Sequence, residues 1–505
     1  MNRSHTGEVP KQPVSTTHWA EHPRWNWAIA ALALIAGVLV RLYFVIHFPT
    51  TTGDGPIYES LAHNWMAHGV YGYPVEGIIK PLDIRMPGYP GFILIISWLF
   101  RRDQQSLMLA QIAMDMGTCV LAALLAGRLV PNTSDVTFNA SARSRVQLAG
   151  LWLAALCPFI GNYAVAPMTE IPATFFTAAA LLAFAGCFAA GAEKRWAPWI
   201  LGGLAAGFGT LIRPETPLLL IALTIVCVWR WRRPADWRVL LRAGALTAAG
   251  FLLPLLPWIL RNAITLHEFQ PLAPRYANEN AEVVPTGFYD WTKTWLIRYG
   301  DVYVTNWKLD SEPLVLGEMP ASAFDNDAER ERIKKLFQEY DQNCCDIPPG
   351  WDAQFEQLAH ERARRHPIRT YLWIPLARSF VLWLTPRIEL LPYSGKLWPL
   401  GEMHRDEPDD FDATVELGLL GLLYAALAFA GFTRIVRYAR GRARTLPAEQ
   451  VWIAAFLAMF CVVRTGYFAH IETPEPRYML ECFPVVFAFA AFLFVPRKLL
   501  QRRGA

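Results

Sequence analysis

Residues 26–47 read NWAIAALALIAGVLVRLYFVIH, a run of 22 residues in which Arg41 is the one formal charge. A helix needs about 20 mostly apolar residues to cross the hydrocarbon core of a bilayer, so this run predicts a membrane span. Nine more stretches have the same character: 106–128, 147–163, 169–190, 197–213, 215–231, 240–260, 412–433, 450–468 and 477–496. The sequence therefore predicts an all-α polytopic membrane protein with about 10–12 spans.

The composition agrees with a membrane protein and excludes a nucleic-acid-binding class. Charged residues make up 18% of the 505 residues, whereas a soluble domain carries about a quarter. The net charge of +4 is scattered, so it forms no footprint for nucleic acid. The eight cysteines show no metal-ligand spacing, and six lie in or beside apolar runs as small buried hydrophobes. A vicinal disulfide stays open for Cys344-Cys345.

The distribution of Lys and Arg predicts the orientation, because these residues stay on the cytoplasmic side in short loops. Their positions agree only if both termini are cytoplasmic, as expected for a bacterial inner (plasma) membrane protein. The outer segments are then 48–105, 164–169, a turn at Arg213-Pro214-Glu215, 261–411 and 469–476. This divides the chain into a cytoplasmic tail (1–25), an N-terminal membrane module (26–261) with the first outer loop 48–105, an extracytoplasmic loop domain (262–367) and a C-terminal membrane module (368–505).

Two apolar runs do not fit as simple spans. Residues 87–100 are short and begin with Pro and Gly residues, so we expect a juxtamembrane helix in the interface. Residues 368–386 contain Arg378, and a full crossing there would break the charge pattern. An interfacial or re-entrant helix is preferred, with a crossing as the alternative. The polar region 262–367 is expected to form a small cap of mixed structure.

Two acidic residues on the predicted outer side are candidates for chemistry. Asp54 lies between two glycines just after the first span, where it is either a turn or N-cap residue or a functional carboxylate. Glu170 begins the fourth predicted span, where it either complements the helix dipole or serves a site. Two carboxylates facing one aqueous cleft provide a general base or ligands for a divalent cation.

Basic residues near the outer face have two readings as well. Arg477 opens the last span and either snorkels to the interface or binds phosphate oxygens in bidentate fashion. Charges within spans are costly, so Asp115 and Arg464 are either functional or paired in an internal salt bridge. Arg213 and Arg261 end helices and are read as interface markers.

Read together, these segments resemble the GT-C glycosyltransferases of the dolichyl-phosphate-mannose protein mannosyltransferase and lipid A aminoarabinose transferase superfamily. The segments that carry the resemblance are Gly53-Asp54 with Tyr58 and Ala62, Arg85-Met86-Pro87-Gly88-Tyr89-Pro90-Gly91, Thr169-Glu170, 207–215, 257–262, His366-Pro367, and Arg477-Tyr478 with Pro484. Many relatives carry an acidic pair in the first loop, whereas here glycines flank Asp54, which leaves a divalent cation open. Residues 262–367 match no pattern of the family.

The resemblance implies a mannosyltransferase-like enzyme of the cell envelope. It would move a hexose or pentose from a polyprenyl-phosphate donor to a glycan, lipid or protein acceptor on the extracytoplasmic side. Asp54 would be the base and Glu170 would orient the sugar or acceptor, and either would be a ligand if a metal is used. The donor phosphate would be bound by Arg477 with Lys80 or Arg85. The sugar and acceptor pocket would contain Tyr58, His63, Tyr89, His470 and Glu472.

Other functions share the predicted topology. A lipid or polysaccharide transporter or flippase would carry paired broken helices in two corresponding halves, and the sequence shows no such internal symmetry. An outer-face ligase or acyltransferase would need a histidine base, for which His63 or His470 would serve. An inactive scaffold also stays open, since Asp54 and Glu170 alone do not exclude it.

Overall fold

The computed structural model describes residues 23–50, 53–100, 103–131, 136–189, 191, 195–276, 283–342, 346–385, 390, 408–440 and 446–500. The predicted tail up to residue 22 and the Cys344-Cys345 pair lie outside these ranges. The helices of the membrane part are α1 (Pro23–His47), α4 (Gln104–Arg128), α5 (Val136–Ala155), α6 (Pro158–Gly161), α7 (Glu170–Ala185), α8 (Ala197–Ile212), α9 (Leu218–Arg230), α10 (Trp237–Thr265), α16 (Pro408–Arg440), α17 (Ala448–His470) and α18 (Phe483–Ala491). Short turns of 3-10 helix extend or link them: η2 (Asn162–Val165), η3 (Gly186–Phe188), η5 (Pro234–Asp236), η10 (Pro476–Cys482), η11 (Phe492–Phe494) and η12 (Arg497–Leu500).

The membrane part is a helical bundle. Within the described ranges, seven helical stretches are long and apolar enough to span a bilayer: Asn26–His47, Gln104–Arg128, Glu170–Phe188, Trp237–Thr265, Asp412–Arg440, Ala448–His470 and Pro476–Phe494. All seven coincide with predicted runs, so the prediction of an all-α, multi-pass membrane protein is confirmed. Exposed Leu, Ile, Val, Phe and Trp side chains are frequent on these helices, as expected where lipid is the solvent.

Three predicted spans take a different form. The span predicted at 147–163 is bent: Asn139–Ala155 and Pro158–Val165 meet at an angle of 47°. Pro158 explains the break, because proline lacks the N–H that would continue the helical ladder. The helices α8 and α9 have 16 and 13 residues, and the Arg213-Pro214-Glu215 turn separates them. At 1.5 Å per residue, α8 is about 24 Å long, shorter than the bilayer core.

The helices α8 and α10 pack more closely than side chains would permit, because glycines line their contact. A Cβ atom on Gly203 would lie 2.4 Å from the Thr247 carbonyl oxygen, and one on Gly250 would lie 2.4 Å from the Ile200 carbonyl oxygen. The same helix α10 contains Pro254 and Pro257. Each proline removes one helical hydrogen bond. This pair of helices forms one wall of the cavity described below.

A buried ion pair ties the first span to its neighbours. Arg41 donates from Nε to Asp115 Oδ2 at 2.8 Å, and the two side chains are 0% and 1% exposed. The Arg41 guanidinium also contacts the carbonyl oxygens of Ala154 and Ala155 at the end of α5. Of the two readings for Asp115, the structure supports the internal salt bridge, since its partner has no other acidic neighbour to neutralise it among the described residues.

The first outer loop folds into α2 (Gly55–His68), the strands β1 (Gly72–Val75) and β2 (Ile78–Pro81), and α3 (Gly88–Leu99). The helix α3 confirms the short helix predicted at 87–100. The antiparallel hairpin was not predicted. Its turn consists of Glu76 and Gly77, both with positive φ, which is the backbone of the tight turns that suit a twisted hairpin.

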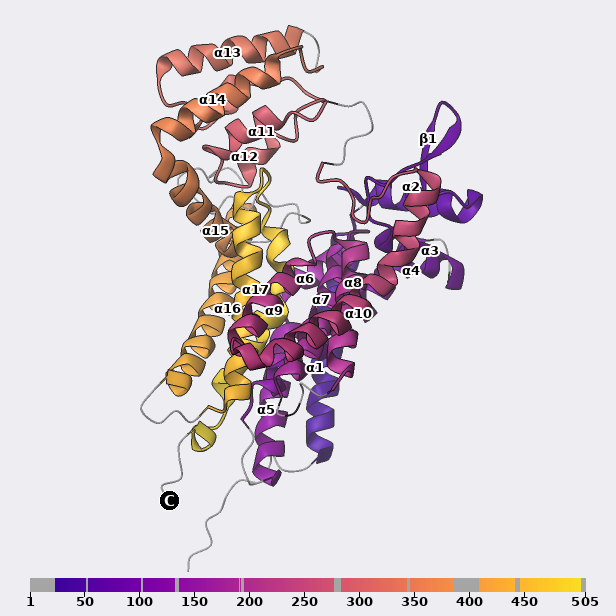
Figure 1. Ribbon diagram of the computed structural model, residues 1–505, viewed down its shortest axis with the longest axis vertical. Helices are drawn as coiled ribbons and strands as arrows, with labels where there is room; N and C mark the ends of the chain where they lie inside the picture. Colours follow the sequence, from indigo (N-terminus) through magenta and orange to yellow (C-terminus); the bar gives the residue numbers. More distant parts are fainter. Residues whose placement is uncertain are drawn as a thin grey trace, which may run out of the picture.

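The cap is helical in its described part and has its own core. It contains α11 (Thr286–Lys293), α12 (Gly300–Tyr303), α13 (Asp327–Gln342) and α14 (Trp351–Arg365), with short 3-10 turns η6 (Leu316–Glu318) and η7 (Ala321–Ala323). Buried aromatic side chains from α11 and α14 pack together, with Phe288 and Trp351 stacked at 5.3 Å. Figure 1 shows these helices at one end of the long axis and the C-terminus at the other.

Arg378 joins the cap to the bundle. It lies in α15 (Ile374–Leu384), which follows a π-helical turn, η8 (Arg369–Trp373); together they have 16 residues and do not form one of the seven long spans. Arg378 is 1% exposed, and its guanidinium donates to the carbonyl oxygens of Lys293 and Leu296 in the cap and of Ala469 and Ile471 at the end of α17. The Arg378 charge, which argued against a membrane crossing by residues 368–386, therefore contacts carbonyl oxygens of the protein.

Candidate functional site

Asp54 lies directly before α2, at the N-cap position, but its side chain does not cap the helix. It instead accepts a hydrogen bond from Arg85 Nη2 at 3.3 Å, and 38% of the Asp54 side chain is exposed. The Asp54 carboxylate therefore binds Arg85 and does not act as the helix cap that was one of its two interpretations. A carboxylate that is partly exposed and contacts one guanidinium is within reach of a substrate, which is what a general base requires.

The start of α2 is pressed against the turn that precedes Glu170. A Cβ atom on Gly55 would lie 2.7 Å from Pro167 Cγ, so only glycine permits this approach. Tyr58, one turn further along α2, is buried between the two acids. Burial raises the pKa of the Tyr58 hydroxyl, and the charge of Asp54 and, more weakly, of Glu170 raises it further. The loop thereby brings both predicted acids to one end of the bundle.

Glu170 begins α7 as predicted, and its side chain is 2% exposed. Its Oε1 atom accepts from Arg213 Nη1 at 3.2 Å and lies 3.5 Å from Arg477 Nη1. Its Oε2 atom is buried and has no hydrogen-bond partner among the described residues. A buried acceptor without a donor costs about 1–3 kcal/mol, so this oxygen is suited to a hydroxyl brought by a ligand.

Arg477 is bound on both sides by acidic groups. It pairs with Glu475 through Nε, and Tyr478 donates its hydroxyl to the same carboxylate at 2.9 Å. A second guanidinium, Arg213, lies 2.7 Å from Glu215. The described cluster comprises Glu170, Glu215, Glu475 and Glu481 with Arg213, Arg464 and Arg477. Since its carboxylates outnumber its guanidiniums, Arg477 has no spare charge for a phosphate in this arrangement.

Arg464 belongs to the same cluster, which decides between its two readings. Its Nη2 atom donates to Glu481 Oε1 at 2.6 Å, and Thr177 donates to the other oxygen of Glu481 at 2.8 Å. The internal salt bridge is therefore what the structure contains. Arg213, Glu475 and Glu481 were not among the predicted site residues. Glu475 lies two positions before Arg477, and this short spacing could have indicated that the two side chains form an ion pair.

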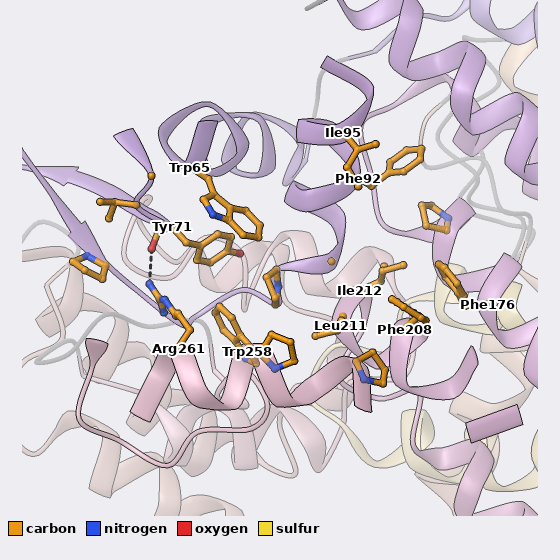
Figure 2. A pocket seen from close by; sticks show the side chains of 18 of the residues that line it. Trp65, Tyr71, Phe92, Ile95, Phe176, Phe208, Leu211, Ile212, Trp258 and Arg261 are labelled. Atoms are coloured by element: carbon orange, nitrogen blue, oxygen red, sulfur yellow. Dashed lines mark hydrogen bonds between the residues drawn. The ribbon is translucent and has the colours of Figure 1, made fainter. Parts of the chain in front are cut away.

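An apolar cavity of about 730 Å³ lies beside this cluster. Figure 2 shows Trp65 and Tyr71 of the first outer loop across from Trp258 and Arg261 of α10, with Phe176, Phe208 and Ile212 further along. Pro172 and Ile212, which line it, lie close in sequence to Glu170 and Arg213. Arg261 is the one charged side chain that the described residues contribute to the lining.

Arg261 is held in place at one end of this cavity. Its guanidinium donates to the carbonyl oxygens of Leu82 and Tyr71, each at 2.8 Å, and lies over the rings of Trp258 and Tyr71. The sequence suggested only an interface marker for this residue. Arg261 lies one turn after two prolines of α10. This position alone did not indicate a cavity that α10 forms with a loop about 180 residues earlier in the sequence.

The remaining predicted residues are not all at the cluster. Lys80 is exposed on β2, His63 is exposed on α2, and His470 is exposed at the end of α17, where Nδ1 contacts the Gly466 carbonyl oxygen. Tyr89 is fully buried and donates to Gln111 Oε1 at 2.7 Å. Glu472 is bound to Arg275 at 2.8 Å and contacts the cap through Lys293.

A metal site is not formed by side chains alone in the described part of the chain. No group of three or more His, Cys, Asp or Glu side chains there is placed to hold a metal ion. Asp54 and Glu170 come to the same end of the bundle, but each is paired with arginine: Asp54 with Arg85, and Glu170 with Arg213 and Arg477. The carboxylates that these two acids would offer to a metal ion are therefore already paired with arginine side chains of the protein.

Comparison with known proteins gives matches only among solved structures; no family model and no curated protein matches the chain. The chain is similar to the oligosaccharyltransferase AglB from Archaeoglobus fulgidus in complex with an inhibitory peptide and a dolichol-phosphate, with 13% identity and a TM-score of 0.49. This match covers 92% of the chain and 50% of AglB, so the chain spans about half the length of that protein.

It is also similar to ArnT from Cupriavidus metallidurans bound to undecaprenyl phosphate, with 13% identity and a TM-score of 0.39. That match covers 94% of this chain and 78% of ArnT. With identities of 12–14% and TM-scores below 0.5, these similarities assign no residue, donor or acceptor to the chain. The chain is a multi-pass helical membrane protein whose fold is similar, over most of its length, to those of AglB and ArnT.

Proposed function

We propose that the protein is a membrane glycosyltransferase that moves a sugar from a polyprenyl-phosphate donor to an acceptor on the extracytoplasmic side. The observation that carries this proposal is the position of the apolar cavity, with Arg261 at one end, beside buried Glu170 and half-exposed Asp54. An isoprenoid chain is apolar and its phosphate is anionic, which matches an apolar lining with one guanidinium.

The reaction needs one base and one anion site. Asp54 takes the proton from the acceptor hydroxyl while the acceptor oxygen bonds to the anomeric carbon. The bond between that carbon and the phosphate oxygen breaks, and the polyprenyl phosphate leaves with the electron pair. The leaving phosphate needs no proton from an acid, so a second catalytic carboxylic acid, as in glycosidases, is not required.

The other charged groups have supporting roles in this proposal. Arg261 binds the donor phosphate as its negative charge grows, and Arg85, bound to Asp54, lies on the same loop. Arg477, the phosphate ligand expected from the motif, orients Glu170 instead, since Glu475 already neutralises it. The free Oε2 atom of Glu170 accepts a hydrogen bond from a hydroxyl of the sugar or acceptor. Lys80, exposed on the hairpin, is available to a phosphate from the solvent side.

The alternatives find less support among the described residues. A histidine-based acyltransferase would use His63 or His470, but both are exposed and outside the acidic cluster. A transporter needs charged groups along a path through the bundle, whereas Arg41 pairs with Asp115 and Arg464 pairs with Glu481. In both pairs the arginine binds a carboxylate of the protein itself, so neither pair provides a charged group for transport.

The test is transfer of radiolabelled sugar from a polyprenyl-phosphate donor into membranes that contain the full chain. Asp54→Asn is expected to lower transfer by about 100-fold or more, because the amide cannot take the acceptor proton. Glu59→Gln is the matched control: Glu59 is on the same helix, exposed and outside the cluster, and its replacement should leave transfer unchanged. An Asp54→Asn protein with full activity would remove Asp54 from the role of base.

A further inference from the structure

A second cavity lies at the opposite end of the bundle from the cap. Its volume is about 530 Å³, and it is formed where the end of α4 and the η3 end of α7 meet the middle of α5 and the starts of α8 and α17. We call it the inner cavity. Among the described residues, the lining includes the guanidiniums of Arg128, Arg143 and Arg195 and the carboxylate of Glu449. The described part of the lining is therefore rich in basic side chains.

The first turn of α17 adds neutral hydrogen-bonding groups. The helix begins at Ala448 after Pro447, and no side chain caps it. The first N–H groups of a helix have no acceptor within the helix, and the positive end of its dipole attracts anions. Both Glu449 and Gln450 of this turn line the cavity.

Gln450 gives a second and independent indication of a ligand. It lines the inner cavity, it is 2% exposed, and its Oε1 atom is buried with no hydrogen-bond partner among the described residues. An amide oxygen accepts hydrogen bonds, so it is suited to a hydroxyl or N–H group that accompanies the anion. Together these groups fit a phosphate that carries a hydroxylated substituent.

The depth of the inner cavity identifies where such a ligand would come from. Gln450 and His470 are at the two ends of α17, 20 residues apart, which is about 30 Å along a helix. This equals the thickness of a bilayer core. The inner cavity therefore lies at the headgroup level of the leaflet opposite the cap, where basic pockets between helices bind anionic lipid headgroups.

We propose that the inner cavity binds a phosphate-bearing anion, and that its occupant is the headgroup of an anionic phospholipid of the leaflet opposite the cap. Arg128, Arg143 and Arg195 bind the phosphate, and Gln450 accepts a hydrogen bond from the headgroup. The ligand and its site are separate from the transferase chemistry, so this proposal stands whether or not the protein transfers a sugar.

The experiment is a titration of the detergent-solubilised full chain by native mass spectrometry. The probes are dihexanoyl phosphatidylglycerol, dihexanoyl phosphatidylcholine and inorganic phosphate. Phosphatidylglycerol should bind tightly and phosphatidylcholine at least tenfold more weakly, because each basic residue near a bilayer contributes about fivefold toward an anion. If inorganic phosphate binds as tightly as phosphatidylglycerol, the anion site is supported and its ligand is soluble. Equal affinity for the two lipids would overturn the proposal.

Variants distinguish this site from general surface charge. The triple change Arg128→Gln, Arg143→Gln and Arg195→Gln should weaken phosphatidylglycerol on the order of 100-fold. Arg145→Gln is the matched control, because Arg145 is exposed on the same helix as Arg143 and does not line the cavity. If the triple variant does not stay monodisperse, Arg195→Gln alone should weaken binding about fivefold. Unchanged binding in either variant would contradict the proposal.

Discussion

Glu170 combines two features that are rarely found together in one buried carboxylate. One oxygen is bound by Arg213 and lies near Arg477, while the other has no donor among the described residues. The two arginines contact the first oxygen and hold it in place. The second oxygen therefore stays available as an acceptor for a ligand hydroxyl. This is why we assign Glu170 to orientation and leave proton removal to the more exposed Asp54.

Arg261 is the residue on which the proposed donor site depends most directly. Replacement of Arg261 by Gln should raise the KM for the polyprenyl-phosphate donor about tenfold, because one charge-assisted hydrogen bond to the phosphate is lost. Steady-state transfer with varied donor concentration measures this. Arg261→Lys should recover part of the affinity, since the charge remains while the fork of donors is lost.

The control for Arg261 is on the same helix. Arg242 is exposed near the opposite end of α10, so Arg242→Gln should leave the KM for the donor unchanged. Arg261 also binds the carbonyl oxygens of Leu82 and Tyr71, and its loss loosens the first outer loop. An effect of Arg261→Lys as large as that of Arg261→Gln, with kcat reduced and KM unchanged, would contradict a role in donor binding.

The sequence predicted some site residues and not others for a physical reason. Asp54, Glu170 and Arg477 are recognisable because each begins or follows a span at the same predicted face. Arg213 and Glu481 are separated by more than 260 positions, and they come together because α7 packs against both α8 and η10. Linear spacing carries no information on such pairs. The consequence is that the motif suggested a free Arg477, whereas its neighbours neutralise it.

Helix boundaries were predicted well where composition alone determines them. The seven long spans follow from apolar length, and α3 and α7 begin at the proline- and acid-marked positions. The break before Pro158 was missed, although proline within an apolar run was a usable signal. The β1–β2 hairpin was missed because its strands have only four residues each. For the cap, the sequence predicted only a small region of mixed structure, and neither its helices nor their packing were predicted.

The junction of the cap with η8 contains an acid-sensitive group, Asp325. Its side chain is 5% exposed and binds Arg369 at 2.8 Å and Arg365 at 3.0 Å. Burial raises the pKa of Asp325, but the hydrogen bond from Arg369 and the nearby arginine charges outweigh it, and the net pKa is lowered. A lowered pKa in the folded state gives stability above the unfolded pKa of about 3.9, and this stability is lost as the pH falls through the folded value.

We therefore expect the cap to loosen as the pH falls below about 4. Protection of cap amides in hydrogen exchange at a series of pH values measures this. Asp325→Asn should remove this dependence and destabilise the cap at neutral pH by about 1–3 kcal/mol, because two partly exposed arginines lose a buried hydrogen-bond partner. Asp327→Asn, a neighbouring exposed position, serves as control. Identical acid profiles for wild type and Asp325→Asn would rule out this carboxyl as the cause.

The molecule as a whole is polarised along its long axis. The cap helices and the first outer loop lie toward one end (Figure 1). The inner cavity lies at the start of α17, and the other end of this helix contacts Arg378 beside the cap, so the cavity is at the opposite end of the bundle. The positive-inside rule assigns the second end to the cytoplasm. This orientation, with both termini inside, was inferred from loops of a few residues each, and it is the part of the fold that packing alone does not determine.

Cysteine labelling of intact cells tests the orientation. A cysteine introduced by Glu331→Cys on the exposed face of α13 should react with a membrane-impermeant maleimide, in a background where Cys344 and Cys345 are serine. A cysteine introduced by Arg233→Cys, exposed between α9 and α10, should react only after the cells are opened. The reverse pattern would place the proposed transfer site on the cytoplasmic side.

Arg378 binds four carbonyl oxygens, two from the cap and two from the segment that leads to Glu475 and Arg477. Arg378 thus connects the cap to the final outer turn, although more than 170 positions separate Leu296 from Ile471. In a chimaera that carries the cap of another protein and keeps the outer turn of this one, the two segments around Arg378 would not match. For the transferase proposed above, an engineered change of acceptor preference should therefore require the exchange of both segments at once.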